Sequence, residues 1–230
     1  MASQPFQLPL PLIPKLRYSG DNFVVHSGVR DVLTRILADN WTSSSNRCFL
    51  VFGAPRAGKT HLCVKLVDEL GRSVAPHFAD GSELERWTVD GLSLGRGDYL
   101  IVDNAEMYLG GLQNSGGFVN LCEMAKQREF KLVLVFGTEL EGLSCDAHVM
   151  SRLRAASQGV IQHPSADDME ALIRAMGRQH GFALTAGRVK FIARRIGTTI
   201  SEVGDYFERV RHLAAVLGRK VTPSLLSDAV

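Results

Sequence analysis

A glycine-rich octapeptide between an apolar run and an amphipathic segment constrains the fold more than any other feature. Residues 53–60 read GAPRAGKT and match the pattern G-x-x-x-x-G-K-[ST]. The preceding run, residues 48–52, is continuously apolar, and residues 60–70 carry leucine and valine at helical spacing. A buried strand, a glycine-rich turn and a helix in this order predict the opening unit of a parallel α/β sheet.

The octapeptide also predicts a binding site for the phosphates of a nucleotide. Its glycines let backbone N–H groups face phosphate oxygens, and the helix that follows adds its positive amino-terminal end. Lys59 is expected to neutralise the β- and γ-phosphates, and Thr60 to ligate Mg²⁺. The loop residues predicted to bind the nucleotide are Gly53, Ala54, Pro55, Arg56, Ala57, Gly58, Lys59 and Thr60.

Two further apolar runs, residues 99–102 and 132–136, lie on either side of a predicted helix over 117–129. Strands that alternate with helices predict a doubly wound parallel sheet. Ligands of such sheets bind at the carboxyl ends of the strands. The sequence therefore places the functional site at the ends of these runs.

Polar side chains follow the ends of the two runs. Asp103 is interpreted as the carboxylate that orients water on Mg²⁺. The next residue is Asn104, and an amide cannot accept a proton from an attacking water, so the sequence favours binding over fast hydrolysis. The sequence leaves open whether Glu106 reaches the γ-phosphate. Thr138 is either a sensor of that phosphate or the first residue of an ordinary loop.

Strand signals stop after Pro164, and only helical patterns follow. Ser165 is predicted to be the N-cap of the first helix. Helices are expected over residues 166–176, 188–196, 202–217 and 223–229. The chain is thereby divided into residues 1–16, an extended tail; residues 17–163, the α/β domain; and residues 164–230, a small all-helical part.

The tail is a candidate docking segment. It contains four prolines, which favour an extended backbone. Leucines at alternate positions on such a stiff segment can present one apolar row to a partner's groove, or the tail can pack on its own domain. The candidate partner-binding residues are Gln7, Leu8, Leu10 and Leu12.

Composition limits the classes of function. Lys and Arg number 26 against 24 Asp and Glu, a net charge of +2, which is small for a chain that binds duplex DNA through its phosphates. The four cysteines are far apart, which argues against a zinc site or a disulfide scaffold. The amino terminus lacks a basic n-region, and no run approaches the ~18 apolar residues of a membrane span. A cytoplasmic location without membrane contact is expected.

Several segments resemble the AAA+ ATPases and, more closely, the DnaA/Hda family of bacterial replication proteins. They are Asp21–Val25, Gly53–Leu62, Ile101–Asn104, Ser151–Leu153 and Gly181–Phe182. The resemblance covers nearly the whole chain. It implies an AAA+ P-loop domain, with a parallel sheet flanked by helices, followed by a small all-helical lid. The implied cofactors are ADP or ATP with Mg²⁺.

The resemblance also implies site residues and partners. Asn22, Phe23 and Val24 would line the adenine pocket, and His61 would extend the P-loop contacts. The tail is similar to the segment with which the regulatory, Hda-type members dock on the sliding clamp of DNA polymerase. Such members promote hydrolysis of DnaA-bound ATP, and so prevent renewed initiation.

Arg152 is the candidate for an arginine finger acting in trans. The residues alone slightly favour a solvated basic turn, whereas the resemblance favours the finger, aimed at DnaA or at another copy in a homo-oligomer. The chain ends at Val230 without room for the DNA-binding domain of DnaA, so no direct sequence-specific DNA binding is expected.

One position departs from the family pattern. Ser201 stands where the family places an arginine that senses phosphate from the lid, and serine cannot neutralise a phosphate. This leaves two alternatives to a clamp-tethered regulator: a self-sufficient ATPase of the helicase-loader type, and an adaptor that holds its nucleotide without hydrolysis.

Overall fold

Within the part of the chain that the structure describes, five parallel strands form a single sheet. The computed structural model describes residues 23–43, 47–74, 76–84, 93–109, 115–197, 199–217 and 222–229. The strands are β1 (Cys48–Gly53), β2 (Pro76–Asp80), β3 (Tyr99–Asp103), β4 (Lys131–Val135) and β5 (Ser157–Ile161). Their spatial order is β2-β3-β4-β1-β5, and every neighbouring pair is parallel. The carboxyl ends of all five therefore meet at one edge of the sheet.

The three strands expected from the apolar runs are confirmed, but two strands were missed. β1, β3 and β4 lie inside the sheet and are almost completely buried. β2 and β5 are the two edge strands, and both mix exposed with buried positions. Phe78 in β2 and Val160 in β5 are exposed, and Gln158 interrupts the apolar pattern of β5. An edge strand is less buried than a central strand, so its sequence need not contain the continuous apolar run by which a buried strand is predicted.

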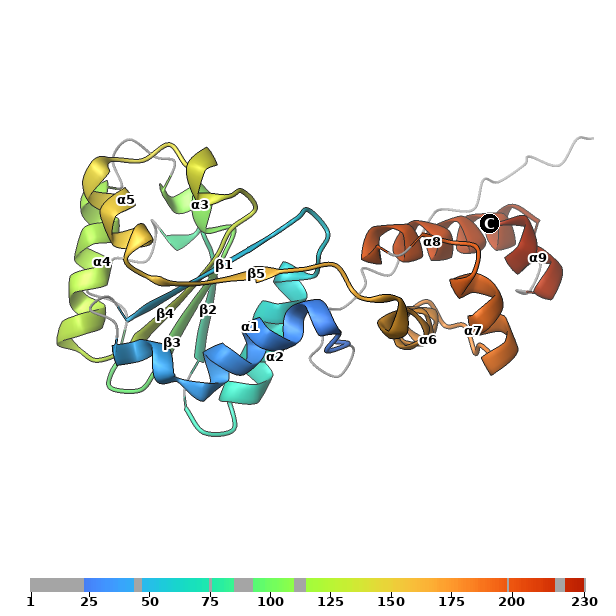
Figure 1. Cartoon of the computed structure of the whole chain (residues 1–230), viewed down its shortest axis with the longest axis horizontal. Coiled ribbons are helices and arrows are strands. Elements are labelled where there is room, and N and C mark those ends of the chain that lie inside the picture. Colours follow the sequence, from blue (N-terminus) through green and yellow to red (C-terminus); the bar gives the residue numbers. More distant parts are fainter. Residues whose placement is uncertain are drawn as a thin grey trace, which may run out of the picture.

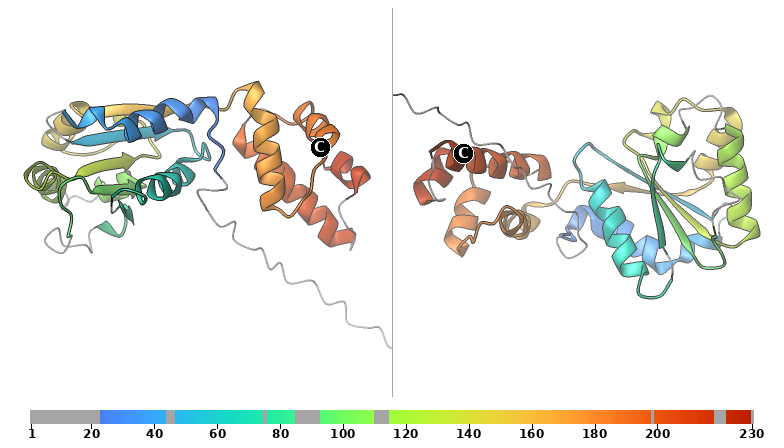
Figure 2. Two further views of the ribbon diagram at one scale, coloured as in Figure 1. Left: turned by 90° about the horizontal axis from the view of Figure 1, so that it is seen from below. Right: turned by 180° about the vertical axis from the view of Figure 1, so that it is seen from behind.

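Helices cover both faces of the sheet (Figures 1 and 2). α1 (Ser27–Ala38) and α2 (Lys59–Leu70) pack on one face, while α3 (Ala105–Leu109), α4 (Ser115–Gln127) and α5 (Ala147–Arg154) pack on the other. Side chains of β1 alternate between these two cores: Phe49 and Val51 join the first, and Leu50 and Phe52 the second. Short 3₁₀ turns, η2 (Asn40–Ser43) and η5 (Leu140–Gly142), complete this part.

The carboxyl-terminal part is all-helical, as expected, and has its own core. It contains η6 (Ala166–Asp168), α6 (Met169–Gln179), α7 (Ala186–Ala193), α8 (Ile200–Leu217) and α9 (Pro223–Asp228). The predicted cap at Ser165 is confirmed, because its side chain forms a capping box with Asp168. α7 starts and ends two to three residues before the predicted range 188–196, because Thr185 caps its amino terminus.

The start of α1 is bonded to the connection between sheet and lid. Asp168 accepts hydrogen bonds from the Ser27 backbone N (3.1 Å) and Oγ (2.6 Å), and from Ser165. Burial opposes the ionised carboxylate, but the hydrogen bonds from Ser165 and Ser27 outweigh burial and lower the pKa of Asp168. Gly28 lies so close to Gln162 that a Cβ would collide with its carbonyl. These contacts fix where the lid leaves the sheet, next to the segment that precedes α1.

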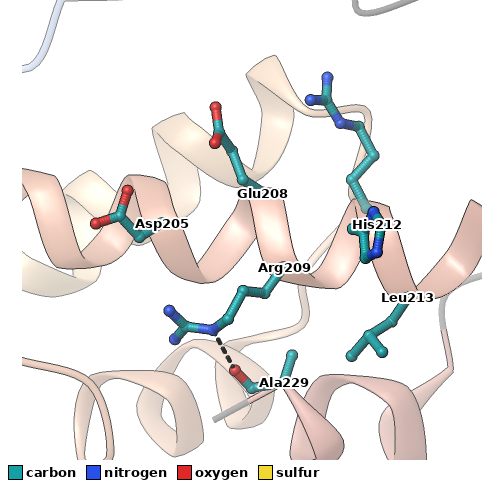
Figure 3. A pocket seen from close by; sticks show the side chains of 7 residues that line it. Asp205, Glu208, Arg209, His212, Leu213 and Ala229 are labelled. Carbon is teal, nitrogen blue, oxygen red and sulfur yellow. Dashed lines mark hydrogen bonds between the residues drawn. The ribbon is translucent and has the colours of Figure 1, made fainter. Parts of the chain in front are cut away.

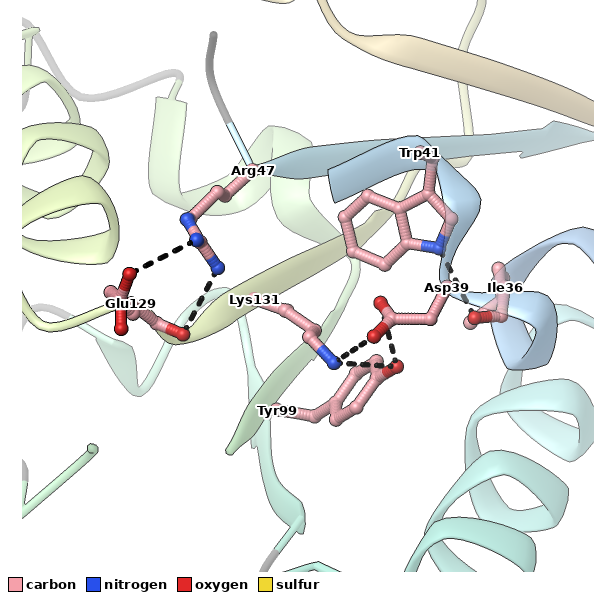
Figure 4. A network of polar contacts seen from close by, with 7 residues as sticks. All are labelled: Ile36, Asp39, Trp41, Arg47, Tyr99, Glu129 and Lys131. Atoms are coloured by element: carbon pink, nitrogen blue, oxygen red, sulfur yellow. Dashed lines mark hydrogen bonds and ion pairs between the residues drawn. The ribbon is translucent and has the colours of Figure 1, made fainter. Parts of the chain in front are cut away.

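A polar network closes the amino end of the sheet (Figure 4). Lys131 is buried, and its ammonium group pairs with Asp39 and lies 4.5 Å from the centre of the Tyr99 ring. Tyr99 donates a hydrogen bond to Asp39, and burial followed by the Asp39 charge raises the pKa of this phenol. Nearby, Trp41 donates to the Ile36 carbonyl. The network therefore ties the end of α1 to β3 and β4, at the edge opposite the P-loop.

Removing the charge of Asp39 is expected to destabilise the fold by about 2 kcal/mol, because Lys131 would keep a buried charge without its counterion. The loss is smaller than for a fully buried pair because 39% of the Asp39 side chain is exposed. Asn is the chosen replacement, since Asp39 has φ +59° and Asn tolerates this conformation. Asp31→Asn, which breaks an exposed pair with Arg35, should change the free energy of unfolding by less than about 0.5 kcal/mol. Urea unfolding measures the free energy of unfolding of both variants. Equal losses in Asp39→Asn and Asp31→Asn would contradict the stabilising role of the Asp39–Lys131 pair.

Candidate functional site

The predicted P-loop lies at the carboxyl end of β1 and leads directly into α2. Gly58 is the N-cap of α2 and has φ +93°, a left-handed conformation that glycine adopts without strain. Arg56 also has a positive φ, +60°. Ala57 is buried and its N–H donates to the Ala54 carbonyl, which closes the loop. The amino end of α2 has no side-chain cap at Gly58 and lies directly at the loop, where its N–H groups would stabilise a bound anion.

The side chains of Lys59 and Thr60 form specific hydrogen bonds at the loop. Lys59 donates hydrogen bonds to the carbonyl oxygens of Gly53 and Ala54, each at 2.9 Å, and so its charge is held inside the loop. Thr60 donates to Asp103 Oδ2 at 2.6 Å, which joins the start of α2 to the end of β3. Residues predicted separately from two distant segments thus meet at one point.

Thr60 and Asp103 fit a Mg²⁺ ion by their chemistry. Both present oxygen atoms, the ligands that this hard cation prefers. Across the described ranges, no group of three or more His, Cys, Asp or Glu side chains could form a metal cage. Mg²⁺ at nucleotide sites is usually held by one or two protein oxygens together with the phosphates, and the chemistry of this pair fits such a site. When bound, the ion would neutralise phosphate charge.

The carboxylates and amides after β3 are engaged with other groups. The Asn104 amide donates to Asp80 Oδ2 at 2.7 Å. Hydrogen bonds from Ser82, and then from Asn104, lower the pKa of Asp80. Glu106 accepts from the Gly137 N–H, with both carboxylate oxygens 3.0 Å away. The Asn104 side chain is therefore hydrogen-bonded to the end of β2, and the Glu106 carboxylate is hydrogen-bonded to the turn after β4.

A cavity of about 390 Å³ lies between the P-loop and the turn after β4. Its walls include Gly53, Ala54 and Pro55 from the P-loop and the exposed Thr138 from the turn. The structure thus brings Thr138 to the same cavity as the P-loop. Whether it senses a phosphate stays a prediction.

A second, smaller cavity of about 60 Å³ lies where the P-loop meets the lid. Phe23 and Val24, two of the residues implied for the adenine pocket, line it together with His61, the residue expected to extend the P-loop contacts. The rings of Phe23 and His61 are 6.3 Å apart, and burial lowers the pKa of His61. Sequence reasoning missed the rest of the wall, since no motif marks these residues. They are His26 before α1, Leu172, Ala175, Met176 and Gln179 from α6, and Ile200 from α8.

The P-loop contacts the lid directly through an ion pair. Arg56 and Asp205 of α8 are 2.8 Å apart, and about half of each side chain is exposed. The Asp205 hydrogen bond raises the pKa of Arg56, and Arg56 in turn lowers the pKa of Asp205. Ser201 lies one turn earlier on the same helix. Thus an arginine from the P-loop reaches the lid one turn beyond Ser201, the position that was expected to lack a phosphate-sensing arginine.

Arg152 lies on α5 and is directed against α4. Its guanidinium donates to Glu123 at 3.3 Å and to the His148 carbonyl at 3.2 Å, and 27% of the side chain is exposed. The Arg152 hydrogen bond is the largest cause of the lowered pKa of Glu123. In this arrangement the guanidinium can reach a partner only after it leaves Glu123.

A third cavity, of about 710 Å³, lies on the lid and is larger than the two described above. Figure 3 shows its charged wall along α8, with Arg209 donating to the Ala229 carbonyl at 3.0 Å. Along α8 the acidic residues Asp205 and Glu208 come first and the basic residues Arg209 and Arg211 follow, and Asp205 belongs to this wall as well as to the Arg56 pair. Among the described residues, none of those predicted for the site lines it.

Some predicted residues lie outside the described part of the chain. They are Asn22 and the docking residues Gln7, Leu8, Leu10 and Leu12. Within the described part, no helix has the length and apolar character needed to cross a bilayer.

The parallel five-stranded sheet, its flanking helices and the helical lid define the AAA+ fold. Among solved structures, the chain is similar to domain III of the replication initiation protein DnaA from Thermotoga maritima. That comparison has a TM-score of 0.69 and 16% identity, over 96% of this chain and 98% of that chain.

Two other similar structures have the same architecture. AMPPCP-bound DnaA from Aquifex aeolicus matches with a TM-score of 0.63 and 16% identity, over 87% of this chain and 66% of that chain. The RuvB Holliday junction branch migration motor of Thermotoga maritima matches with a TM-score of 0.61 and 18% identity, over 93% of this chain and 71% of that chain. No protein-family model and no curated protein sequence matches the chain. At these identities the likeness establishes the fold.

Proposed function

We propose that the chain binds an adenine nucleotide, ADP or ATP, together with Mg²⁺ at the P-loop. The observation that carries the proposal is the 2.6 Å contact of Thr60 with Asp103, beside a loop that already holds the Lys59 ammonium group. The small cavity between Phe23, His61 and α6 supports a nucleoside next to these phosphate groups. DnaA has been solved with AMPPCP on the same fold.

Intrinsic hydrolysis is proposed to be slow. General base catalysis needs a carboxylate within hydrogen-bond reach of the attacking water. Asn104 occupies the position after Asp103 and bonds Asp80, and Glu106 is occupied by the Gly137 N–H. The chain's own residues therefore bind and orient the phosphates better than they activate water.

Thermal unfolding with and without added nucleotide tests the proposed site directly. ADP with Mg²⁺ should raise the melting temperature, because a ligand that binds only the folded state stabilises it. AMP at equal concentration should raise it much less, since the P-loop contacts are made to the outer phosphates. Equal shifts with ADP and AMP, or no shift, would contradict the proposal.

We further propose that the chain regulates replication initiation through the sliding clamp and DnaA. The likeness to domain III of DnaA and the finger candidate Arg152 support this role. Arg152 would leave Glu123 and place its charge at the nucleotide of DnaA. A self-sufficient ATPase and a non-hydrolysing adaptor are the alternatives.

Two assays separate these roles. Pull-down on the clamp should retain the wild-type chain and lose Gln7→Ala/Leu12→Ala. With clamp loaded on DNA, the chain should stimulate ATP hydrolysis by DnaA, and Arg152→Ala should lose this effect while Arg154→Ala, an exposed neighbour, retains it. Steady-state turnover without DnaA would favour the self-sufficient ATPase. Full activity of Arg152→Ala would favour the adaptor.

The Arg56–Asp205 pair predicts a gain of nucleotide affinity on mutation. Asp205→Ala should raise ADP affinity about three- to tenfold, because Arg56 becomes available to the phosphates and a nearby negative charge is removed. Glu208→Ala removes a carboxylate from the same helix that acts on Arg56 only through space and without a hydrogen bond, so it should raise affinity by less than about twofold. Titration calorimetry compares the two. A loss of affinity in Asp205→Ala would show that the pair supports binding.

A further inference from the structure

His26 is the one histidine of the described chain that is almost fully buried, with 2% of its surface exposed, and it lines the small cavity between P-loop and lid. The rest of that wall is mainly apolar, with Phe23, Val24 and Met176 among its members. At about 60 Å³ the cavity is smaller than the roughly 300–1,000 Å³ of most ligand sites. Met176, a flexible side chain on the lid, is suited to move aside when a ligand enters.

The backbone holds His26 firmly at this place. Its N–H donates to the Val24 carbonyl at 2.9 Å, and its own carbonyl accepts from Val29 and Arg30 at the start of α1. The neighbouring Ser27 is bonded to Asp168. The backbone of His26 is therefore fixed at the start of α1, and its side chain is buried in the cavity wall.

One nitrogen of this ring is unsatisfied. Among the described residues, His26 Nδ1 is buried and has no hydrogen-bond partner. Burial lowers the pKa of His26, the Asp168 charge opposes this shift, and His163 adds to it, so the ring is neutral near pH 7. A buried nitrogen without a partner is costly, and a phenylalanine would fill similar space without that cost. A donor group of a ligand bound in the cavity would supply the hydrogen bond that Nδ1 lacks.

We propose that His26 hydrogen-bonds the base of the bound nucleotide, with Nδ1 accepting from the 6-amino group of adenine, and that this contact selects adenine over guanine. A neutral imidazole presents one donor and one acceptor nitrogen, and adenine carries an amino donor where guanine carries an oxygen acceptor. With the proton on Nε2, Nδ1 therefore attracts adenine and repels the guanine oxygen. The inference rests on the proposed nucleotide site and names the residue that reads the base.

The test compares three ligands by titration calorimetry: ADP, purine riboside 5′-diphosphate, which lacks the 6-amino group, and inorganic tripolyphosphate. Wild type should bind ADP about tenfold more tightly than the purine analogue. His26→Phe should bind both with the affinity that wild type has for the analogue, and tripolyphosphate as wild type does. The matched control is His212→Phe, a histidine exposed on α8, which should keep the tenfold preference.

The outcomes separate this inference from the proposed function. If wild type binds ADP and the purine analogue equally, His26 does not read the amino group, whatever the behaviour of the variant. Retention of the tenfold preference by His26→Phe would likewise overturn the assignment. If wild type binds none of the three ligands, the proposed nucleotide site itself fails, and this inference fails with it.

Discussion

Lys59→Ala is expected to reduce the affinity for ADP about 100-fold or more. Lys59 holds its ammonium group against the Gly53 and Ala54 carbonyls, where β- and γ-phosphates would lie, and charge-assisted hydrogen bonds are the strongest that a side chain offers. Two such contacts at about 1.5 kcal/mol each account for a loss of this size. Titration calorimetry with ADP and Mg²⁺ measures it.

The matched control is Lys65→Ala on the same helix. Lys65 forms an i,i+4 pair with Glu69 at 2.7 Å, one turn and a half beyond the P-loop. Lys65→Ala removes one positive charge from α2, as Lys59→Ala does, but it removes no group from the proposed phosphate site. ADP affinity should therefore change by less than about twofold. If both variants bind ADP equally well, the loop is only a tight turn in a strand–helix unit.

Phe207→Ala is expected to destabilise the lid by about 3–5 kcal/mol. Phe207 is completely buried in the core of the lid, where its ring lies 5.5 Å from His180 and 5.9 Å from Phe182. Deletion of a buried aromatic ring leaves a cavity that surrounding side chains fill only in part. The lid core is separate from the two cores of the sheet, so the loss falls mainly on α6 to α9.

Hydrogen exchange distinguishes this local effect from global unfolding. Amides of α6 and α8 should exchange faster in Phe207→Ala, while those of β1 and β4 keep their protection. ADP affinity should also fall, because both lid helices line the small cavity. Leu217→Ala removes an exposed side chain from α8 and should cost less than about 0.5 kcal/mol. Uniform loss of protection in the sheet would show that lid and sheet unfold as one unit.

The central part of the fold was predictable from sequence because its signals are local. The octapeptide, the continuous apolar runs of β1, β3 and β4, and the cap at Ser165 each specify their own conformation. The edge strands were missed because partial exposure leaves β2 and β5 without a continuous apolar pattern.

The candidate site was predictable only where a motif marks it. Thr60 and Asp103 were identified from separate motifs, and the structure places them 2.6 Å apart. His26 and the α6 residues of the small cavity carry no motif, because their role depends on how the lid folds back toward the P-loop. The pairing of Arg56 with Asp205 joins positions 149 residues apart, and no local pattern encodes such a contact.

The most direct test of the central claim is a calorimetric titration of the wild-type chain with ADP in the presence of Mg²⁺. The P-loop, the Thr60–Asp103 contact and the cavity beside Phe23 predict saturable binding of one ADP per chain, with a Kd of about 10 μM or tighter. Absence of saturable heat at about 1 mM ADP would contradict the assignment of this AAA+ fold as a working nucleotide-binding protein.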